Sequence, residues 1–322
     1  MSAAWANGTR ETYGSGLLIF HVFCDQRGVP EEERCPAHPT LILAFISACA
    51  GSYSGSALAN ILFGVQAWHT LHGQPWAASK AEIQAALTGG KARAPASSKN
   101  PKRDLFTTDL IERLRTQLDL TAPLDAAVFA CLTVAFWSTA RLGEFVLGNL
   151  TSFVAAEHVK RSDVRSTTDR ADNPVTVIFV PKTKCSATGE DLYYAPQVGP
   201  CDPVAAMSNH LHINDLPQDT HLFGYTHEGQ PRPMTRTAFT RRLNRAACAL
   251  GTITLHFHGI HIGSVLEYML RGVPLEVVKR MGRWSSEAFT VYLREHAVVL
   301  APYLQDSPAF VPFNQAILPP VR

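Results

Sequence analysis

Only one stretch of this sequence has the pattern of a β-hairpin. Residues 174–184, PVTVIFVPKTK, are rich in β-branched side chains and predict a strand. The segment SATGED follows as a turn, and LYYAP follows as a short returning strand. Elsewhere, apolar residues recur at helical spacing between Gly, Pro and Ser residues that separate one segment from the next. We therefore expect a mainly α fold with a small antiparallel β-hairpin or sheet, in the α+β class.

A small, polar and basic stretch divides the chain. Residues 89–101, GGKARAPASSKNP, have the composition of an interdomain linker. A length of 322 residues agrees with about two domains. We expect residues 1–12 to form a loose tail and residues 13–88 to form a helical domain. Residues 102–296 would form the second domain, and residues 297–322 a C-terminal tail.

The net charge of +2 does not by itself indicate a nucleic-acid partner, but the basic residues are clustered. Local basic clusters bind phosphates whatever the total charge, although such side chains also simply solvate exposed surfaces. The first cluster surrounds the predicted linker and comprises Lys91, Arg93, Lys99, Lys102 and Arg103. The second lies on or just before a predicted amphipathic helix and comprises Arg232, Arg236, Arg241, Arg242 and Arg245.

Cysteine usage and hydropathy bear on the compartment. The chain has seven scattered cysteines and no Cys-x-x-Cys pair, which favours reduced thiols over a disulfide framework. It contains no run of 18 apolar residues, so we expect no membrane span. The first residues lack the basic-then-apolar layout of a secretory signal. The sequence therefore predicts an intracellular protein.

Several residue types are suited to phosphate chemistry. Arg141 directly follows a predicted buried helix, where its guanidinium can be held rigidly and present a bidentate fork to a phosphate. Glu144 can orient it, although the two residues are equally compatible with a structural ion pair. Lys184 lies at the hairpin turn and can reach a substrate as a general acid, but lysines in turns are usually solvated.

The segment HFHGIH supports a different class of function. Its histidines, His256, His258 and His261, have a spacing similar to the His-x-His-x-Asp-His metal site of metallohydrolases. Ile260 stands where that motif requires Asp. A histidine-cluster metalloenzyme is therefore an alternative, but a weak one.

The order of the motifs is more specific than any one of them. ARLGE comes first, the Thr-Lys of the hairpin follows, and HGIHIGS, GVP and MGRWSS come next, with a tyrosine eight residues after the tryptophan. In this order the chain resembles the catalytic domain of tyrosine recombinases, the phage-integrase family. The GRWSS and Ile-Gly-Ser forms look most like recombinases of Crypton-type eukaryotic mobile elements. The resemblance covers roughly residues 102–296, and residues 13–88 fit the family's core-binding domain less specifically.

The resemblance implies a role for each matching residue. Tyr292 attacks a DNA phosphate and forms a 3′-phosphotyrosyl bond, and Lys184 protonates the departing 5′ oxygen. His258 helps to accept or return the proton of the tyrosine. Arg141 clamps the phosphate oxygens, and Trp284 packs beneath the site. The resemblance implies no metal and no nucleotide cofactor.

His261 is the departure from the family pattern, because it stands where the family has a second clamp arginine. A histidine is shorter, cannot fork across two oxygens and is only partly charged at neutral pH. Losing such a clamp slows the reaction by about 10²–10³-fold, by analogy with lost oxyanion donors. His256 or Arg283 would have to compensate for the lost clamp in space. A DNA-binding protein of the same fold with an impaired site is therefore the second hypothesis.

The resemblance also implies an assembly. The two domains would form a C-shaped clamp around double-stranded DNA, with the basic linker across the backbone and the helix at 235–250 against a groove. A homodimer would bind each site, and a homotetramer would form the synaptic complex. Residues 297–322 would exchange between neighbouring subunits, and a eukaryotic protein of this kind would act in the nucleus.

Overall fold

The computed structural model confirms a mainly helical chain with small antiparallel sheets. The chain divides into two compact units, Met1–Lys102 and Arg103–Arg322, and each is described by itself. No helix among the described residues is long and apolar enough to cross a membrane. The described residues are 5, 7–98, 105–183, 186, 188–252, 255 and 257–284.

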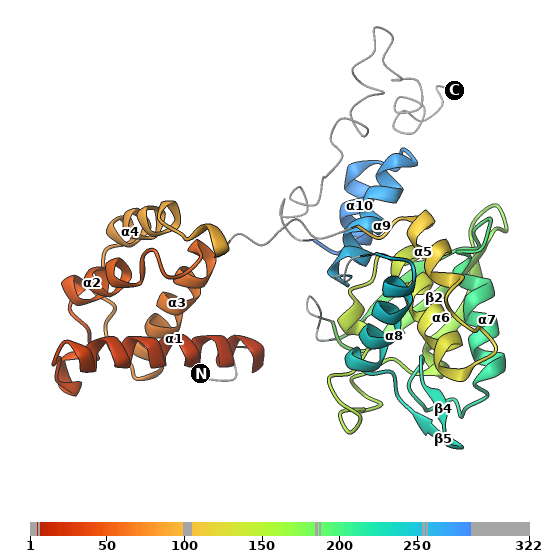
Figure 1. Cartoon of the computed structure of the whole chain (residues 1–322), viewed down its shortest axis with the longest axis horizontal. Helices are drawn as coiled ribbons and strands as arrows, with labels where there is room; N and C mark the ends of the chain where they lie inside the picture. Colours follow the sequence, from red (N-terminus) through yellow and green to blue (C-terminus); the bar gives the residue numbers. More distant parts are fainter. Residues whose placement is uncertain are drawn as a thin grey trace, which may run out of the picture. The chain divides into compact units, whose positions relative to one another are not determined.

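The first unit packs four helices around one apolar core (Figure 1). The rings of Phe20 and Phe45 meet edge to face with centroids 5.1 Å apart, and Ile42 and Leu58 are buried beside them. The helices are α1 (Asn7–Gln26), α2 (Pro39–Cys49), α3 (Gly55–Leu71) and α4 (Lys80–Ala92), with short 3-10 turns at Glu31–Glu33 and Ala96–Ser98.

Two segments predicted to be irregular are helical. Helix α1 begins at Asn7, inside the predicted tail, because its first turns pack on α3 through Tyr13. Helix α4 continues to Ala92, so the predicted linker begins inside a helix. Gly90 is buried there, and a Cβ at this position would lie 2.4 Å from Cδ2 of Leu58. Gly90 therefore permits close helix packing and does not end the helix.

Two glycines of the first unit should respond oppositely to alanine. A Cβ on Gly64 of α3 would lie 2.5 Å from the carbonyl oxygen of Tyr13, which is backbone and cannot yield easily. We expect Gly64→Ala to lower the free energy of unfolding by about 1–3 kcal/mol. Gly89, exposed in α4, has no atom within 4 Å of that position. Gly89→Ala should stabilise by about 1 kcal/mol through helix propensity. Urea denaturation of both variants tests this, and equal effects would contradict it.

The second unit contains the remaining elements. Its helices are α5 (Thr108–Arg115), α6 (Pro123–Trp137), α7 (Pro203–Ile213), α8 (Arg236–Ala249), α9 (His258–Leu270) and α10 (Leu275–Met281), with 3-10 turns at Leu142–Glu144 and Arg161–Asp163. Its strands are β1 (Val164–Thr168), β2 (Pro174–Val180), β3 (Glu190–Tyr194), β4 (Tyr225–His227) and β5 (Gln230–Arg232).

Helix α6 lies at the centre of this unit (Figure 1). Every residue from Asp125 to Trp137 is buried, as expected for a helix that is apolar on all sides. It contacts α5, α7, α8, α9, β3 and β4. The indole of Trp137 donates to the carbonyl of Cys201 at 2.9 Å, so its polar atom is satisfied inside the core. The buried helix predicted before Arg141 is therefore confirmed, and the other elements that it contacts pack around it.

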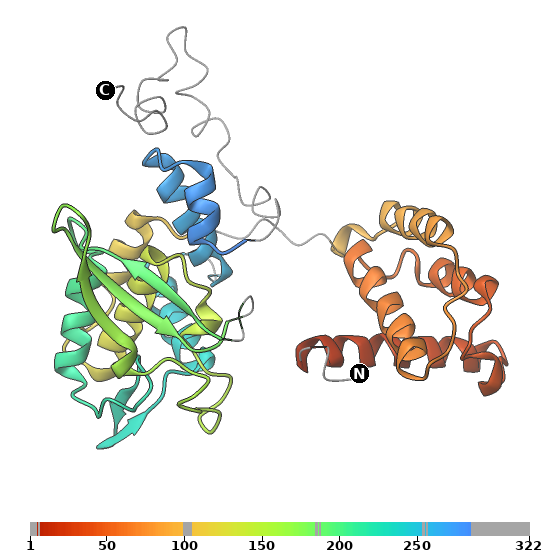
Figure 2. The ribbon, with the colours of Figure 1, turned by 180° about the vertical axis from the view of Figure 1, so that it is seen from behind.

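The predicted hairpin is confirmed and has a third strand. Strands β1, β2 and β3 form an antiparallel sheet in that order, with Ile178 opposite both Val164 and Leu192 (Figure 2). The sequence analysis missed β1 because its residues, VRSTT, are mostly exposed and carry no apolar alternation. It also missed the short β4–β5 hairpin, whose strands have three residues each.

Candidate functional site

Arg141 lies in the connection that leaves the buried helix α6. The helix ends at Trp137, and Arg141 precedes the 3-10 turn Leu142–Glu144. Its backbone N–H donates to Oε2 of Glu144 at 3.0 Å. Its NH2 group donates to the carbonyl oxygens of Gly282 and Arg283, at 3.3 and 3.2 Å. The Arg141 side chain is 25% exposed. The end of α6 and the turn after α10 therefore hold this guanidinium in one orientation.

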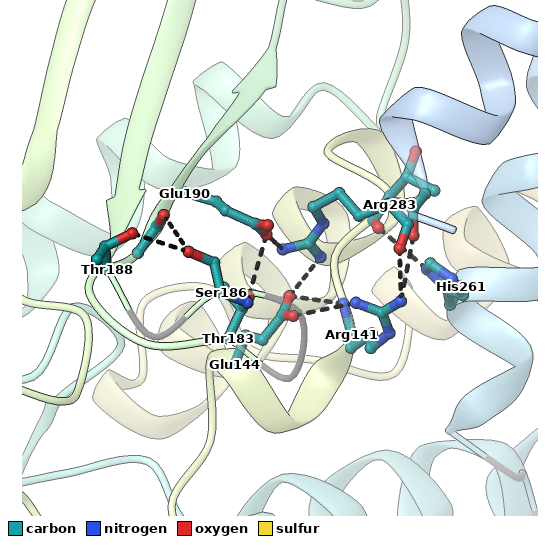
Figure 3. A network of polar contacts seen from close by, with 11 residues as sticks. Arg141, Glu144, Thr183, Ser186, Thr188, Glu190, His261 and Arg283 are labelled. Carbon is teal, nitrogen blue, oxygen red and sulfur yellow. Dashed lines mark hydrogen bonds and ion pairs between the residues drawn. The ribbon is translucent and has the colours of Figure 1, made fainter. Parts of the chain in front are cut away.

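Glu144 binds a second arginine more closely than it binds Arg141. Its Oε2 accepts from NH2 of Arg283 at 2.6 Å, whereas its Oε1 is 3.6 Å from NH1 of Arg141 (Figure 3). The other side of Arg283 reaches β3, where NH1 donates to Oε2 of Glu190 at 3.2 Å. Thr183 donates its hydroxyl hydrogen to the same Glu190 oxygen at 3.1 Å. One network therefore joins the end of α6, the β2–β3 hairpin and the turn after α10.

His261 lies in the first turn of α9, facing the connection after α6. Its Nδ1 donates to the carbonyl oxygen of Thr139 at 3.0 Å, and its ring centroid is 4.7 Å from that of Trp284. Burial, together with the positive charge of Arg141, lowers the pKa of His261 to about 3. The imidazole is therefore neutral at physiological pH, so it supplies no charge where the family has its second arginine.

The small residues of HGIHIGS let α9 approach the rest of the unit. A Cβ on Gly263 would lie 1.8 Å from the carbonyl oxygen of Phe106, which leaves no room for a side chain. The next residue, Ser264, shares a 3.0 Å hydrogen bond with the hydroxyl of Thr139. These contacts seat the first turns of α9, and with them His258 and His261, against the end of α6.

His258 and Trp284 complete the cluster. His258 is exposed at the first residue of α9, with its ring centroid 6.3 Å from that of His261. Trp284 folds back over Gly282, where a Cβ would lie 1.6 Å from Cζ3 of the indole. The glycine of MGRW is therefore required for the tryptophan to reach His261.

The structure thus brings six of the residues singled out in the sequence into one site. These are Arg141, Glu144, His258, His261, Arg283 and Trp284. Lys184 and Tyr292 lie outside the described residues. The sequence analysis missed Glu190, because no pattern links a strand residue to an arginine that lies 93 positions away.

The metal-site interpretation gains no geometric support from the described part of the chain. Within those residues, no group of three or more His, Cys, Asp or Glu side chains is placed to hold a metal ion. His261 is instead hydrogen-bonded to a backbone carbonyl and lies beside an indole at an interplanar angle of 47°. His256, the first histidine of the motif, lies outside the described residues.

A basic groove with a volume of about 830 Å³ runs beside α8. Arg241 and Arg245 are exposed one helical turn apart along its wall, and Arg232 at the end of β5 lines it too. Arg236, at the first residue of α8, is exposed, and its NH2 would be 3.3 Å from a Cβ on Gly143.

Arg242 also lines this groove, but its guanidinium is bound inside the protein. Its Nε and NH2 donate to the two carboxylate oxygens of Asp125, each at 2.6 Å, and NH2 donates to the carbonyl of Gln117 at 2.8 Å. The two side chains are 15% and 9% exposed. Arg242 thus has a structural partner, and its role as a DNA contact stays a prediction. This residue joins α8 to α6, because a buried carboxylate needs a paired cation.

The linker cluster is only partly within the described residues. Lys91 and Arg93 are exposed at the end of α4 in the first unit, which leaves them accessible to a polyanion. Lys99, Lys102 and Arg103 lie outside the described residues.

No protein-family model and no curated protein matches this sequence. Among solved structures, the XerH site-specific recombinase, bound to its palindromic difH substrate in a post-cleavage complex, is similar with a TM-score of 0.56. The two chains are 13% identical, and the match covers 95% of this chain and 78% of XerH. A lambda integrase dimer bound to a COC′ core site is 13% identical over 91% of this chain and 73% of that one, with a TM-score of 0.47.

The XerA recombinase is 15% identical over 96% of this chain and 93% of its own, with a TM-score of 0.41. Of these three structures, only XerH has a TM-score above 0.5, and at 13% identity this similarity shows a shared fold. This chain therefore has the fold of a site-specific recombinase of the XerH kind.

Proposed function

We propose that this chain is a site-specific recombinase that breaks and rejoins duplex DNA through a covalent bond to Tyr292. The observation that carries the proposal is the convergence of Arg141, His258 and Trp284 on one site. They come from the end of α6, the start of α9 and the turn after α10, and they occupy the order that the recombinase resemblance requires. The shared fold with XerH supports the same conclusion.

In the proposed reaction, the oxygen of Tyr292 forms a bond to a DNA phosphorus, and the bond from that phosphorus to the 5′ oxygen breaks. Lys184 gives a proton to the departing 5′ oxygen, and His258 takes the proton of the tyrosine. Arg141 stabilises the charge on the non-bridging oxygens. The Arg141 side chain is 25% exposed, so this cation is partly accessible to a phosphate oxygen.

A covalent-trapping assay tests this proposal. The protein is incubated with a pool of nicked duplexes of random sequence, and protein–DNA adducts that survive SDS are measured. We expect an adduct with the natural chain and none with Tyr292→Phe, which removes only the nucleophilic oxygen. An adduct that persists in Tyr292→Phe would contradict the assignment of the nucleophile.

A second function is favoured by one observation. His261 is neutral, so the site lacks the second clamp charge. A chain that binds DNA without cleaving it would retain duplex DNA in the same assay and form no adduct. This outcome would assign the chain to DNA binding alone. The proposal for which surface contacts DNA would still stand.

We propose that duplex DNA contacts the basic groove beside α8. Arg241→Ala and Arg245→Ala should each weaken binding and each reduce the slope of log K against log salt by about 1, because each removes one phosphate contact. Fluorescence anisotropy across a salt series measures this slope. Arg170→Ala is the matched control, since Arg170 is exposed in the β1–β2 turn and does not line the groove. A slope that falls equally in the control would contradict the assignment.

The assembly and the element type are part of the same proposal. Strand exchange at two sites requires a dimer on each site and a tetramer in the synaptic complex. The Crypton-type motifs GRWSS and Ile-Gly-Ser favour a mobile-element recombinase, whose reaction would integrate or excise DNA.

A further inference from the structure

Arg283 is buried at the centre of the network in Figure 3, yet the family pattern assigns it no role. Its side chain is 10% exposed and bridges Glu144, at 2.6 Å, and Glu190, at 3.2 Å. Its backbone φ is +56°, in the left-handed region that non-glycine residues rarely adopt. A buried arginine on such a backbone is held by its surroundings, here by carboxylates from two other elements.

Glu144 has two arginines within reach, and the geometry decides which one it pairs with. The bond to Arg283 is 1.0 Å shorter than the approach to Arg141, since the two distances are 2.6 and 3.6 Å. At 3.6 Å the contact with Arg141 is an ion pair without a hydrogen bond. Glu144 is 7% exposed, so water screens little of its charge.

We propose that Arg283 is the positioning residue of this site, holding the carboxylate of Glu144 away from Arg141 so that Arg141 keeps its positive charge for a phosphate. The inference rests on the proposed function. Without Arg283, Glu144 turns to the remaining cation and forms the close, bidentate pair that arginine and carboxylate favour. The carboxylate of Glu144 then neutralises Arg141 and competes with the phosphate for it.

The backbone of Arg283 serves the same purpose. Its carbonyl oxygen and that of Gly282 accept from NH2 of Arg141, at 3.2 and 3.3 Å. The side chain thus anchors the turn that orients Arg141, and the bond to Glu190 ties this turn to the β2–β3 hairpin. A cation that does not touch the substrate therefore determines how the catalytic arginine is presented.

The experiment is a double-mutant cycle. Arg283→Met keeps the length of the side chain and removes its charge, and Glu144→Gln removes the competing charge but keeps an acceptor for the Arg141 N–H. We expect Arg283→Met to slow adduct formation by about 10²-fold, as for a lost oxyanion donor, and the double variant to recover to within about 10-fold of the natural chain. Arg283→Lys should recover part of the loss. Arg280→Met, an exposed arginine in α10, is the matched control.

A second readout separates this inference from the proposed function. Inorganic phosphate should raise the unfolding temperature of the natural chain more than that of Arg141→Met, because only the natural chain has the cation. Arg283→Met should lose this difference, and the double variant should regain it. This pattern without any adduct would refute the proposed function and retain the positioning role.

Either of two results with the variants of Arg283 would overturn the inference. One is an Arg283→Met variant that keeps both the rate and the phosphate effect. The other is a double variant as impaired as Arg283→Met, which would mean that Arg283 is structural support only. Equal phosphate stabilisation of the natural chain and Arg141→Met would also overturn it.

Discussion

A His261→Arg variant should form the covalent protein–DNA adduct about 10²–10³ times faster than the natural chain. The gain follows from the state of the native residue, because burial and the charge of Arg141 keep His261 neutral, with a pKa of about 3. An arginine at this position adds a permanent cation and a fork that spans two phosphate oxygens. Single-turnover measurement of adduct formation on a nicked duplex gives the ratio of rates.

Two controls make this result interpretable. His261→Gln changes the side chain without adding charge, so it should not increase the rate. Circular dichroism and the unfolding temperature establish that the arginine variant is folded, since it places a third cation near Arg141 and Arg283 and we expect it to be less stable. A folded arginine variant with no gain in rate would mean that His261 is not the missing charge.

Acid should destabilise the second unit strongly, by about 5 kcal/mol between pH 6.5 and pH 5. Burial lowers the pKa of three of its histidines, to about 4 for His210 and about 3 for His221 and His261. The unfolded chain takes up protons below pH 6.5, whereas the folded unit does not until near pH 3–4, so stability is lost as the pH falls through this window. Each histidine contributes about 1.6 kcal/mol over this window, because the unfolded imidazole is already half protonated at pH 6.5.

Hydrogen exchange of the α6 amides, measured at several pH values, reports this loss. His221→Gln removes one titrating group and should reduce the dependence on pH by about a third. In the first unit, the histidine with a lowered pKa among the described residues is His69, so its amides should lose less protection. The prediction would be wrong if the protection of α6, corrected for intrinsic exchange rates, were the same at pH 6.5 and pH 5.

The sequence was sufficient for those features that depend on local pattern. The apolar run before Arg141 could only be a buried helix, and it is α6. The β-branched run at 174–184 and the short LYYAP segment were predicted to pair as a hairpin, and they form β2, which ends at Val180, and β3. The order of motifs also placed Arg141, His258 and Trp284 in one hypothesis about a site. Periodicity and motif order are properties of the chain itself, so no contact had to be known.

The sequence did not predict which partner a side chain contacts when several partners are possible. Arg241, Arg242 and Arg245 look alike in sequence, but Arg242 faces the buried carboxylate of Asp125 while the other two are exposed. The start of α1 at Asn7 and the polar strand β1 were missed for a related reason. Both are stabilised by packing or pairing with a distant segment, and their own residues carry little signal.

Composition, periodicity and motif order therefore determined the fold class, the hairpin and the type of chemistry to consider. Tertiary structure alone decided the charge state of His261, the pairing of Arg242 with Asp125 and the sharing of Glu144 between Arg141 and Arg283. The physical reason is that these properties depend on burial and on distances of a few ångströms between residues more than 100 positions apart. Electrostatic interaction energies change steeply over such distances, and sequence spacing does not encode them.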